Sequence, residues 1–132
     1  HRYRGGCQSI FFITRPSLAT QFIELMEAVA AQYGYRVDDI GGYIQPIEHN
    51  RACQMQFDIF YDPTSKFDVE LVRILYHDAI TTLVKEGALF TRPYGELASL
   101  VYERATSYAA ALRRVKKVFD PNNIMNPGTL CF

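Results

Sequence analysis

The chain has 132 residues, of which 48% are hydrophobic and 21% are charged, as is typical of a globular protein. Such a length predicts one domain that buries roughly two thirds of its unfolded surface without disulfides or a structural metal. The formal net charge of +0 gives no reason to expect nucleic acid or an anionic membrane as a partner. No apolar run is long enough to span a membrane and no signal peptide is present. The three widely spaced cysteines predict a reduced, cytoplasmic protein.

The sequence carries few motifs for chemistry. Three cysteines, Cys7, Cys53 and Cys131, lie far apart without a Cys-x-x-Cys pair, so neither a zinc site nor a disulfide framework is predicted. No phosphate loop, Gly-x-Gly-x-x-Gly, His-Glu-x-x-His helix or defensible Ser-His-Asp order occurs. We therefore predict no metal site, and the sequence does not identify a catalytic residue.

The first elements in chain order are a strand and a helix. Residues 7–14 are rich in β-branched and aromatic side chains and lie between Gly and Pro, which predicts a strand. Ser17 offers an N-cap for an amphipathic helix over residues 18–33, and Gly34 suits its C-terminal cap.

Two strands follow, over residues 43–47 and 52–61, joined by a polar connection that contains His49. In the second of these strands polar and apolar residues alternate, which predicts one buried and one polar face: the polar residues are Gln54, Gln56 and Asp58, and the apolar ones are Met55, Phe57 and Ile59. The polar face either meets solvent, as antiparallel sheets allow, or faces a ligand. His49 is likewise either part of a solvated turn or functional.

A capping box from Ser65 to Asp68 opens a second helix over residues 66–86, which Gly87 ends. A short last strand is expected over residues 88–91. The resulting β-α-β-β-α-β order predicts an α+β fold, the ferredoxin-like split β-α-β arrangement, with an antiparallel sheet and both helices on one face. Two further helices, about 95–104 and 107–119, are predicted beyond this unit.

The last helix is basic and ends at about Asp120, because the residue before proline is pushed out of the α region. Asn126-Pro127-Gly128 turns the chain again, and Gly128 can adopt a positive φ where a backbone approaches another group closely. Together these features predict a tail with a defined shape.

The string from Phe119 to Gly128, Phe-Asp-Pro-Asn-Asn-Ile-Met-Asn-Pro-Gly, resembles the C-terminal signature of FAD-linked oxidases of the vanillyl-alcohol oxidase and p-cresol methylhydroxylase type. Most of the chain shares this resemblance, including both Gly-Gly pairs and the aromatic first strand. It implies that residues 1–132 form a single cap or substrate domain of a larger flavoenzyme, whose FAD-binding domain is absent from this chain. The start at His1 agrees with a fragment or processed subunit.

The resemblance also implies a reaction, in which hydride passes from an alcohol, a phenol or a 2-hydroxy acid to flavin. Ser9 stands where some relatives carry the histidine that attaches FAD, so non-covalent FAD is implied. The implied partners are an FAD-binding domain or subunit and a small-molecule substrate, and a homodimer is possible. This fragment alone is expected to be inactive.

Arg92, at the edge of the predicted sheet and fixed by the following proline, is a candidate anion clamp, although it could instead cap the preceding helix. The resemblance places Arg92 at the arginine that holds a substrate phenolate, but Thr91 stands where the family has the neighbouring tyrosine. The resemblance therefore implies an anionic substrate that need not be a phenol. The expected substrate-binding residues are Arg92, Tyr94, Gln45, His49, Gln54 and Gln56. The expected cofactor-binding residues are Asn126, Gly128 and Thr129.

Two other classes of function stay open. A ferredoxin-like fold can serve a free-standing small-molecule binding or regulatory module. It can also serve a structural subunit that pairs through its sheet. A flavin-containing complex with an FAD-binding domain would separate the flavoenzyme from both.

Overall fold

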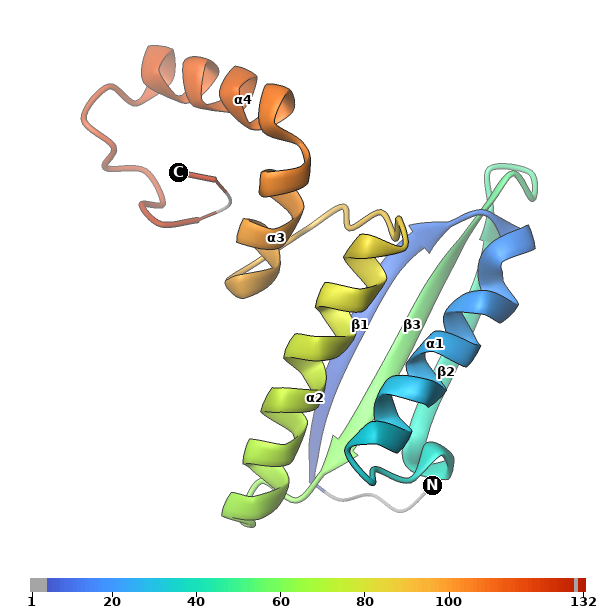
Figure 1. The fold of residues 1–132 in the computed structure, drawn as a ribbon. Coiled ribbons are helices and arrows are strands. Elements are labelled where there is room, and N and C mark those ends of the chain that lie inside the picture. The colour runs from blue at the N-terminus through green and yellow to red at the C-terminus, as the bar shows by residue number, and fades with distance from the viewer. Residues whose placement is uncertain (1–4, 130) are drawn as a thin grey trace. The chain divides into compact units, whose positions relative to one another are not determined.

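A computed structural model describes residues 5–129 and 131–132, and the chain forms two compact units. Unit 1 extends to Thr91 and contains the sheet with its two long helices; unit 2, Arg92–Phe132, contains the last two helices and the tail (Figure 1). We describe each unit by itself. That the chain acts as one cap domain stays a prediction.

Apart from the strand expected over residues 88–91, the predicted elements are present, with changes at their ends. Unit 1 has the order β1 (Gly6–Thr14), α1 (Ala19–Gln32), β2 (Ile40–Ile47), β3 (Ala52–Tyr61) and α2 (Lys66–Lys85), with 3₁₀ turns at Pro16–Leu18 and Val37–Asp39. Unit 2 has α3 (Glu96–Arg104) and α4 (Thr106–Phe119).

The sheet of unit 1 is antiparallel, with β3 between β1 and β2. This arrangement confirms the α+β class, and Figure 1 shows α1 and α2 on the same face of the sheet. The strand predicted over residues 88–91 is wrong: only Leu89 pairs, as a single bridge to Ile13. The chain bends at Thr91 and Arg92 before Pro93, so the pairing does not extend. The ferredoxin-like assignment stays a prediction.

The core of unit 1 lies between the sheet and the helices. Met55, Phe57 and Ile59 of β3 are all buried, as the alternation predicted. Phe12 of β1 lies among three other rings, with ring centroids 5.0 Å from Phe22, 6.1 Å from Phe57 and 5.7 Å from Phe90. Such aromatic packing fixes the face of the sheet that is covered, and therefore the face that the helices leave open.

Of the predicted helix caps, one is absent, one is present and one is half formed. Ser17 is not an N-cap, because it lies inside the 3₁₀ turn and α1 begins after Leu18. Gly34 ends α1 as expected, with φ +65. Ser65 Oγ accepts the Asp68 N–H at 3.2 Å, but the Asp68 carboxylate reaches the N–H of Asp62, so the capping box is only half formed.

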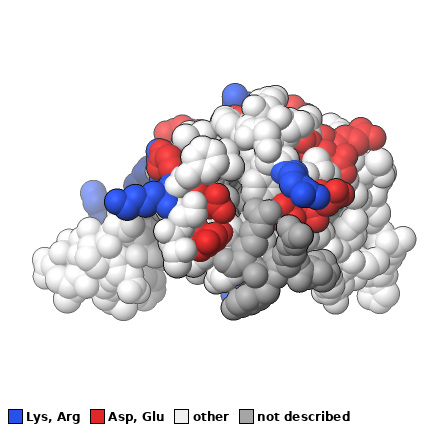
Figure 2. Space-filling model, turned by 90° about the horizontal axis from the view of Figure 1, so that it is seen from below, with Lys and Arg blue, Asp and Glu red and all other residues white. Residues whose placement is uncertain are grey.

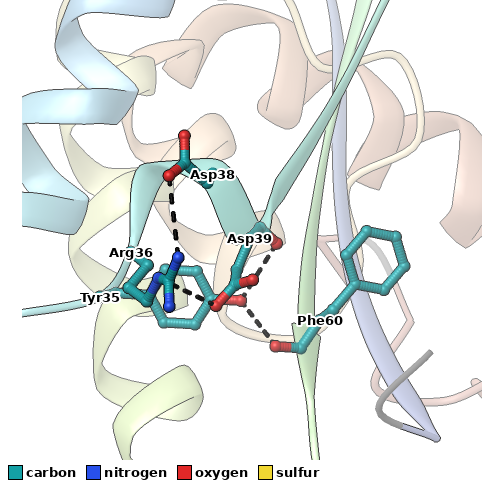
Figure 3. Close-up of polar contacts among 5 residues, drawn as sticks. All are labelled: Tyr35, Arg36, Asp38, Asp39 and Phe60. Carbon is teal, nitrogen blue, oxygen red and sulfur yellow. Dashed lines mark hydrogen bonds and ion pairs between the residues drawn. The ribbon is translucent and has the colours of Figure 1, made fainter. Parts of the chain in front are cut away.

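A tyrosine joins the loop before β2 to the end of β3 (Figure 3). The Tyr35 hydroxyl lies 2.6 Å from the Phe60 carbonyl oxygen and 3.3 Å from that of Asp39. The Arg36 guanidinium lies 3.9 Å from both Asp38 and Asp39. These contacts fix the start of the edge strand β2 and so help to set the register of β2 on β3.

The same end of unit 1 carries many carboxylates. Figure 2 shows acidic side chains gathered there beside fewer basic ones. Asp62 accepts the N–H and the hydroxyl of Thr64, at 2.8 and 2.7 Å, and this hydroxyl contact is the largest cause that lowers the Asp62 pKa. Glu70 pairs with Arg73 at 2.7 Å. The carboxylates of this end are therefore used in turns and in surface pairs.

Candidate functional site

The face of the sheet opposite the helices carries the polar residues of β3. In the pairing register Gln56 lies between Phe11 of β1 and Tyr43 of β2, and Gln54 lies between Ile13 and Gln45. We call this surface the outer face. Because side chains two residues apart point to the same side of a strand, the sequence alternation correctly predicted which residues of β3 lie here.

A hydrogen-bonded cluster fixes one end of the outer face. Ser9 Oγ donates to Asp58 Oδ1 at 2.5 Å, and Gln56 Nε2 donates to both Asp58 oxygens, at 2.9 and 3.1 Å. A Cβ on Gly41 would come within 3.2 Å of Asp58 Cβ and of the Phe60 ring. Gly41 therefore leaves room for Asp58 beside β2, and the carboxylate is held in one orientation.

The other predicted residues of unit 1 lie along the edge strand and its hairpin. The Tyr43 hydroxyl donates to Gln45 Oε1 at 3.1 Å. His49 is exposed in the turn between β2 and β3, where Glu48, His49 and Asn50 all have positive φ, of 50, 55 and 65. Three consecutive residues of this kind make a tight reversal, so His49 is placed at the hairpin tip and not on the outer face.

In unit 2 a buried carboxylate organises the tail. Asp120 follows α4 directly, as predicted, and is only 5% exposed. Its oxygens accept the N–H groups of Ile124 at 2.9 Å and Met125 at 2.8 Å, and one lies 2.5 Å from Lys116 Nζ. The Lys116 contact, helped by the two N–H groups, holds the pKa of Asp120 below its ordinary value. Asp120 is therefore ionised at neutral pH and ties the tail to α4.

Lys116 makes further contacts with the same tail. Its ammonium donates to the Met125 carbonyl oxygen and lies 5.3 Å from the centroid of the Phe132 ring. One turn earlier, Arg113 Nε donates to the Cys131 carbonyl oxygen at 3.0 Å. Two cations of α4 thus hold the chain at two separate points after Asp120.

The three predicted cofactor-binding residues lie in one turn of this tail. Asn126 and Gly128 have φ of 48 and 74, and the Thr129 N–H lies 3.3 Å from the Asn126 carbonyl oxygen. Gly128 faces open space, since a Cβ there would meet nothing within 4 Å. The backbone is therefore open to a close approach, as contact with one part of FAD would need.

Gly128 also lines a cavity of about 510 Å³ within unit 2. Its walls combine small, hydroxyl and charged residues, among them Gly95, Ser99, Tyr102, Glu103, Thr106 and Arg113. Burial is the largest cause that raises the pKa of the Tyr102 phenol, so this ring stays a neutral hydrogen-bonding group at ordinary pH. That Asn126, Gly128 and Thr129 contact FAD stays a prediction.

Arg92 and Tyr94 lie at the start of unit 2, on either side of the buried Pro93. Both side chains are exposed, Tyr94 by 61%. They precede Gly95, whose φ of 54 turns the chain into α3. The candidate substrate residues are therefore divided: Arg92 and Tyr94 belong to unit 2, and the others belong to unit 1.

Sequence reasoning missed several residues that shape these sites. Ser9 was considered only as a replacement for a histidine, and its bond to Asp58 depends on a strand register that no local pattern reveals. The Lys116–Asp120 pair does have a sequence signal, because residues four apart lie on one face of a helix. The amide partners of Asp120 follow only from the shape of the turn.

Among the described residues, no group of three or more His, Cys, Asp or Glu side chains could hold a metal ion. Within the same part of the chain, no helix is both long and apolar enough to cross a membrane.

Comparison with known proteins gives one match, and it lies inside unit 2. Residues 96–130 match the family model described as FAD linked oxidases, C-terminal domain. No curated protein and no solved structure matches the chain. The matched stretch contains α3, α4, Asp120 and most of the tail. The match supports an FAD-linked oxidase C-terminal domain, and with it a flavoprotein and oxidoreductase context.

Proposed function

We propose that this chain is the C-terminal, substrate-binding part of an FAD-dependent oxidoreductase of the vanillyl-alcohol oxidase and p-cresol methylhydroxylase type. One observation carries the proposal: the stretch that matches the FAD-linked oxidase model is the one in which Asp120 and Lys116 hold a shaped tail. A tail fixed by a buried ion pair presents its backbone in one conformation, as a cofactor contact requires.

In this proposal the turn of Asn126, Gly128 and Thr129 contacts FAD, which accepts a hydride from the substrate when it is bound. Gly128 contributes its lack of a side chain, so that the backbone can lie against the cofactor. Ser9 offers no side chain for a covalent link of the kind a histidine makes, which favours non-covalent FAD. The rest of the cofactor lies in an FAD-binding domain or subunit.

The substrate is an alcohol, a phenol or a 2-hydroxy acid. The Arg92 guanidinium binds its anionic or electron-rich end with planar donors, and Tyr94 lies beside it in the chain. The outer face supplies orienting amides from Gln54, Gln56 and Gln45, of which Gln56 is already fixed by Asp58. His49, at the tip of the β2–β3 hairpin, is the last of the proposed substrate-binding residues.

A direct test is to purify this chain in complex with an FAD-binding domain and to add alcohols, phenols and 2-hydroxy acids without oxygen. Bleaching of the flavin absorbance by one class supports the proposal and names the substrate. A stable flavin-containing complex that none of the three classes reduces would contradict the proposed reaction.

A second candidate function rests on unit 1, because no part of unit 1 lies in the matched stretch. A three-stranded sheet with an ordered polar cluster on its outer face is also what a small-molecule binding or regulatory module needs. Binding of small ligands by the purified chain, without any flavin partner, would favour this module.

A further inference from the structure

One amide on the outer face is held in a single orientation. Gln56 Nε2 donates to both Asp58 oxygens, at 2.9 and 3.1 Å. A carboxylate accepts hydrogen bonds and does not donate them, so the end of the Gln56 amide that faces Asp58 must be its NH2 group. Ser9 Oγ, 2.5 Å from Asp58 Oδ1, holds the carboxylate in place. The chemistry of Asp58 therefore fixes which end of this amide is turned away from it.

The carbonyl end of the same amide is open to another group. Gln56 Oε1 has no partner among the residues that the structure describes. In that part of the chain no buried side-chain oxygen or nitrogen lacks a partner, so this oxygen reaches solvent. A carbonyl oxygen only accepts hydrogen bonds. Gln56 therefore presents an acceptor on the outer face, and the group that binds this acceptor must carry a donor hydrogen.

Two aromatic rings lie beside this acceptor. Phe11 of β1 and Tyr43 of β2 are the residues directly opposite Gln56 in the pairing register. Their side chains are 40% and 49% exposed. Side chains that lie opposite each other across a sheet are neighbours on one face. A ligand that binds Gln56 Oε1 therefore meets an aromatic ring on either side, which suits a ligand that itself contains a ring.

The charge of Asp58 disfavours an anionic group at this point. Asp58 lies two residues from Gln56, and their side chains are in direct contact on the same face. A carboxylate of the ligand would meet a carbonyl oxygen that cannot donate to it, and a second negative charge beside that oxygen. A neutral hydroxyl group meets neither obstacle, because it donates its hydrogen and carries no charge.

We propose that Ser9 and Asp58 are positioning residues, which make Gln56 an acceptor for a neutral hydroxyl group of a ring-bearing ligand. Gln56 is among the expected substrate-binding residues, whereas neither positioning residue is. The proposal rests on the proposed function, which places the substrate at the outer face. It adds the residues that choose between a hydroxyl and a carboxylate there.

The test measures binding of two probes, benzyl alcohol and benzoate, to the purified full chain without FAD. The probes share a ring and differ in the polar group, and binding is followed by NMR through the side-chain amide signals of Gln56. The parent is expected to bind benzyl alcohol at least about tenfold more tightly than benzoate, which lacks the donor and is repelled by Asp58. A parent that prefers benzoate, or that binds neither probe at Gln56, would overturn the proposal.

Asp58→Asn tests the positioning role. An asparagine can turn either end of its amide to Gln56, so Gln56 can then present its NH2 group outward. The preference for benzyl alcohol over benzoate is expected to fall at least about fivefold. Asp38→Asn removes one carboxylate from a side chain that is 89% exposed, and this control should leave the preference within about twofold. A lower melting temperature of Asp58→Asn with an unchanged preference would show that Asp58 only supports the fold, and would overturn the proposal.

Gln56→Leu removes the acceptor itself. It is expected to weaken binding of benzyl alcohol roughly three- to tenfold, as loss of one hydrogen bond does. Gln21→Leu, a change of the same kind at an exposed position of α1, is the control and should leave binding unchanged. Equal affinity of the two variants for benzyl alcohol would overturn the proposal.

These results are separate from the fate of the proposed function. A complex whose flavin is reduced by substrate, in a chain without the preference at Gln56, would overturn this proposal and leave the proposed reaction standing. A chain that shows the preference, and loses it in Asp58→Asn, supports the role of Gln56 even where its flavin complex is never reduced. That last result would contradict only the proposed reaction.

Discussion

The two units of the chain are held together by different kinds of interaction. Unit 1 buries a continuous core under its sheet, in which Phe22, Leu75 and Ile80 are 0% exposed. Unit 2 buries few large side chains, and Asp120 with Lys116 holds its tail while Val118 and Phe119 of α4 stay exposed. The difference indicates that unit 1 is stabilised by its core, whereas the tail of unit 2 is held by an ion pair and hydrogen bonds to Asp120.

The largest expected effect is on the free energy of unfolding, and it tests the contrast between the two units at the core of unit 1. Leu75→Ala should lower the free energy of unfolding by about 2–5 kcal/mol, because it leaves a cavity at a fully buried site. Val118→Ala in unit 2 should change it by less than about 0.5 kcal/mol, since that side chain is largely exposed. Urea unfolding of both variants measures the difference, and similar costs would contradict the contrast between the units.

The next prediction concerns the substrate end of unit 2. In the reconstituted flavoenzyme Arg92→Ala should lower kcat/KM by roughly one to two orders of magnitude, as loss of a charge-assisted partner costs about 1.5–3 kcal/mol. Arg92→Lys should recover only part, because an ammonium keeps the charge but loses the planar fork. Steady-state kinetics with a thermal melt provide the measurement. If both variants melt and turn over like the parent, Arg92 does not bind the substrate.

A third prediction addresses the tail. Asp120→Asn should speed hydrogen exchange at the Ile124 and Met125 amides roughly tenfold, because both donate to the charged carboxylate. The exchange of Tyr35, whose N–H bonds to Ala30 in unit 1, should stay unchanged and serves as the internal control. Unaltered exchange at the two tail amides would show that Asp120 does not organise the tail.

The same carboxylate gives a pH dependence with a definite sign. The folded pKa of Asp120 lies below its ordinary value, so folding favours the ionised form. Its contribution to stability is therefore fully present above the unfolded value of about 3.9 and is lost as the pH falls through the lower folded pKa. Acid titration of the tail amide shifts by NMR should show this loss in the parent and not in Asp120→Asn.

The smallest expected effect lies on the outer face of unit 1. Ser9→Ala removes the donor to Asp58 and should cost about 0.5–1.5 kcal/mol of stability, the usual net contribution of one hydrogen bond. Thr81→Ala, whose hydroxyl bonds a helix carbonyl, is a control for loss of a similar group away from the cluster. Chemical denaturation compares the two variants. A loss of stability for Ser9→Ala smaller than that for Thr81→Ala would show that the Ser9–Asp58 bond does not stabilise the outer face.

Much of unit 1 could be predicted because its local patterns agree with its packing. The alternation in β3 gave the correct bounds, Ala52–Tyr61, and the correct buried side. The strand over residues 88–91 failed because composition does not show how many residues of a short run find a partner, and here Leu89 alone does. Ser17 failed as a cap because Pro16 favours a tighter turn at that point.

The candidate sites were less predictable. The bend at Asp120 and the positive φ of Gly128 follow from Asp-Pro and Asn-Pro-Gly, which restrict the backbone locally. The contacts of Asp120 with Ile124 and Met125, and of Ser9 with Asp58, depend on how separate segments meet. Such contacts bring together residues whose spacing in the sequence carries no signal of its own.

The most direct measurement of the central claim, that this chain completes a flavin site, is a titration of the FAD-loaded binding domain with this chain, followed by flavin fluorescence. We expect a saturable change that reports contact of the tail with FAD, while the chain alone binds free FAD weakly or not at all because it lacks a pyrophosphate-binding loop. Gly128→Val should abolish the change in fluorescence, since the valine side chain would fill the space through which the backbone approaches FAD. Tight stoichiometric binding of FAD by the chain alone, or no change in fluorescence when a complex with the domain forms, would contradict the account.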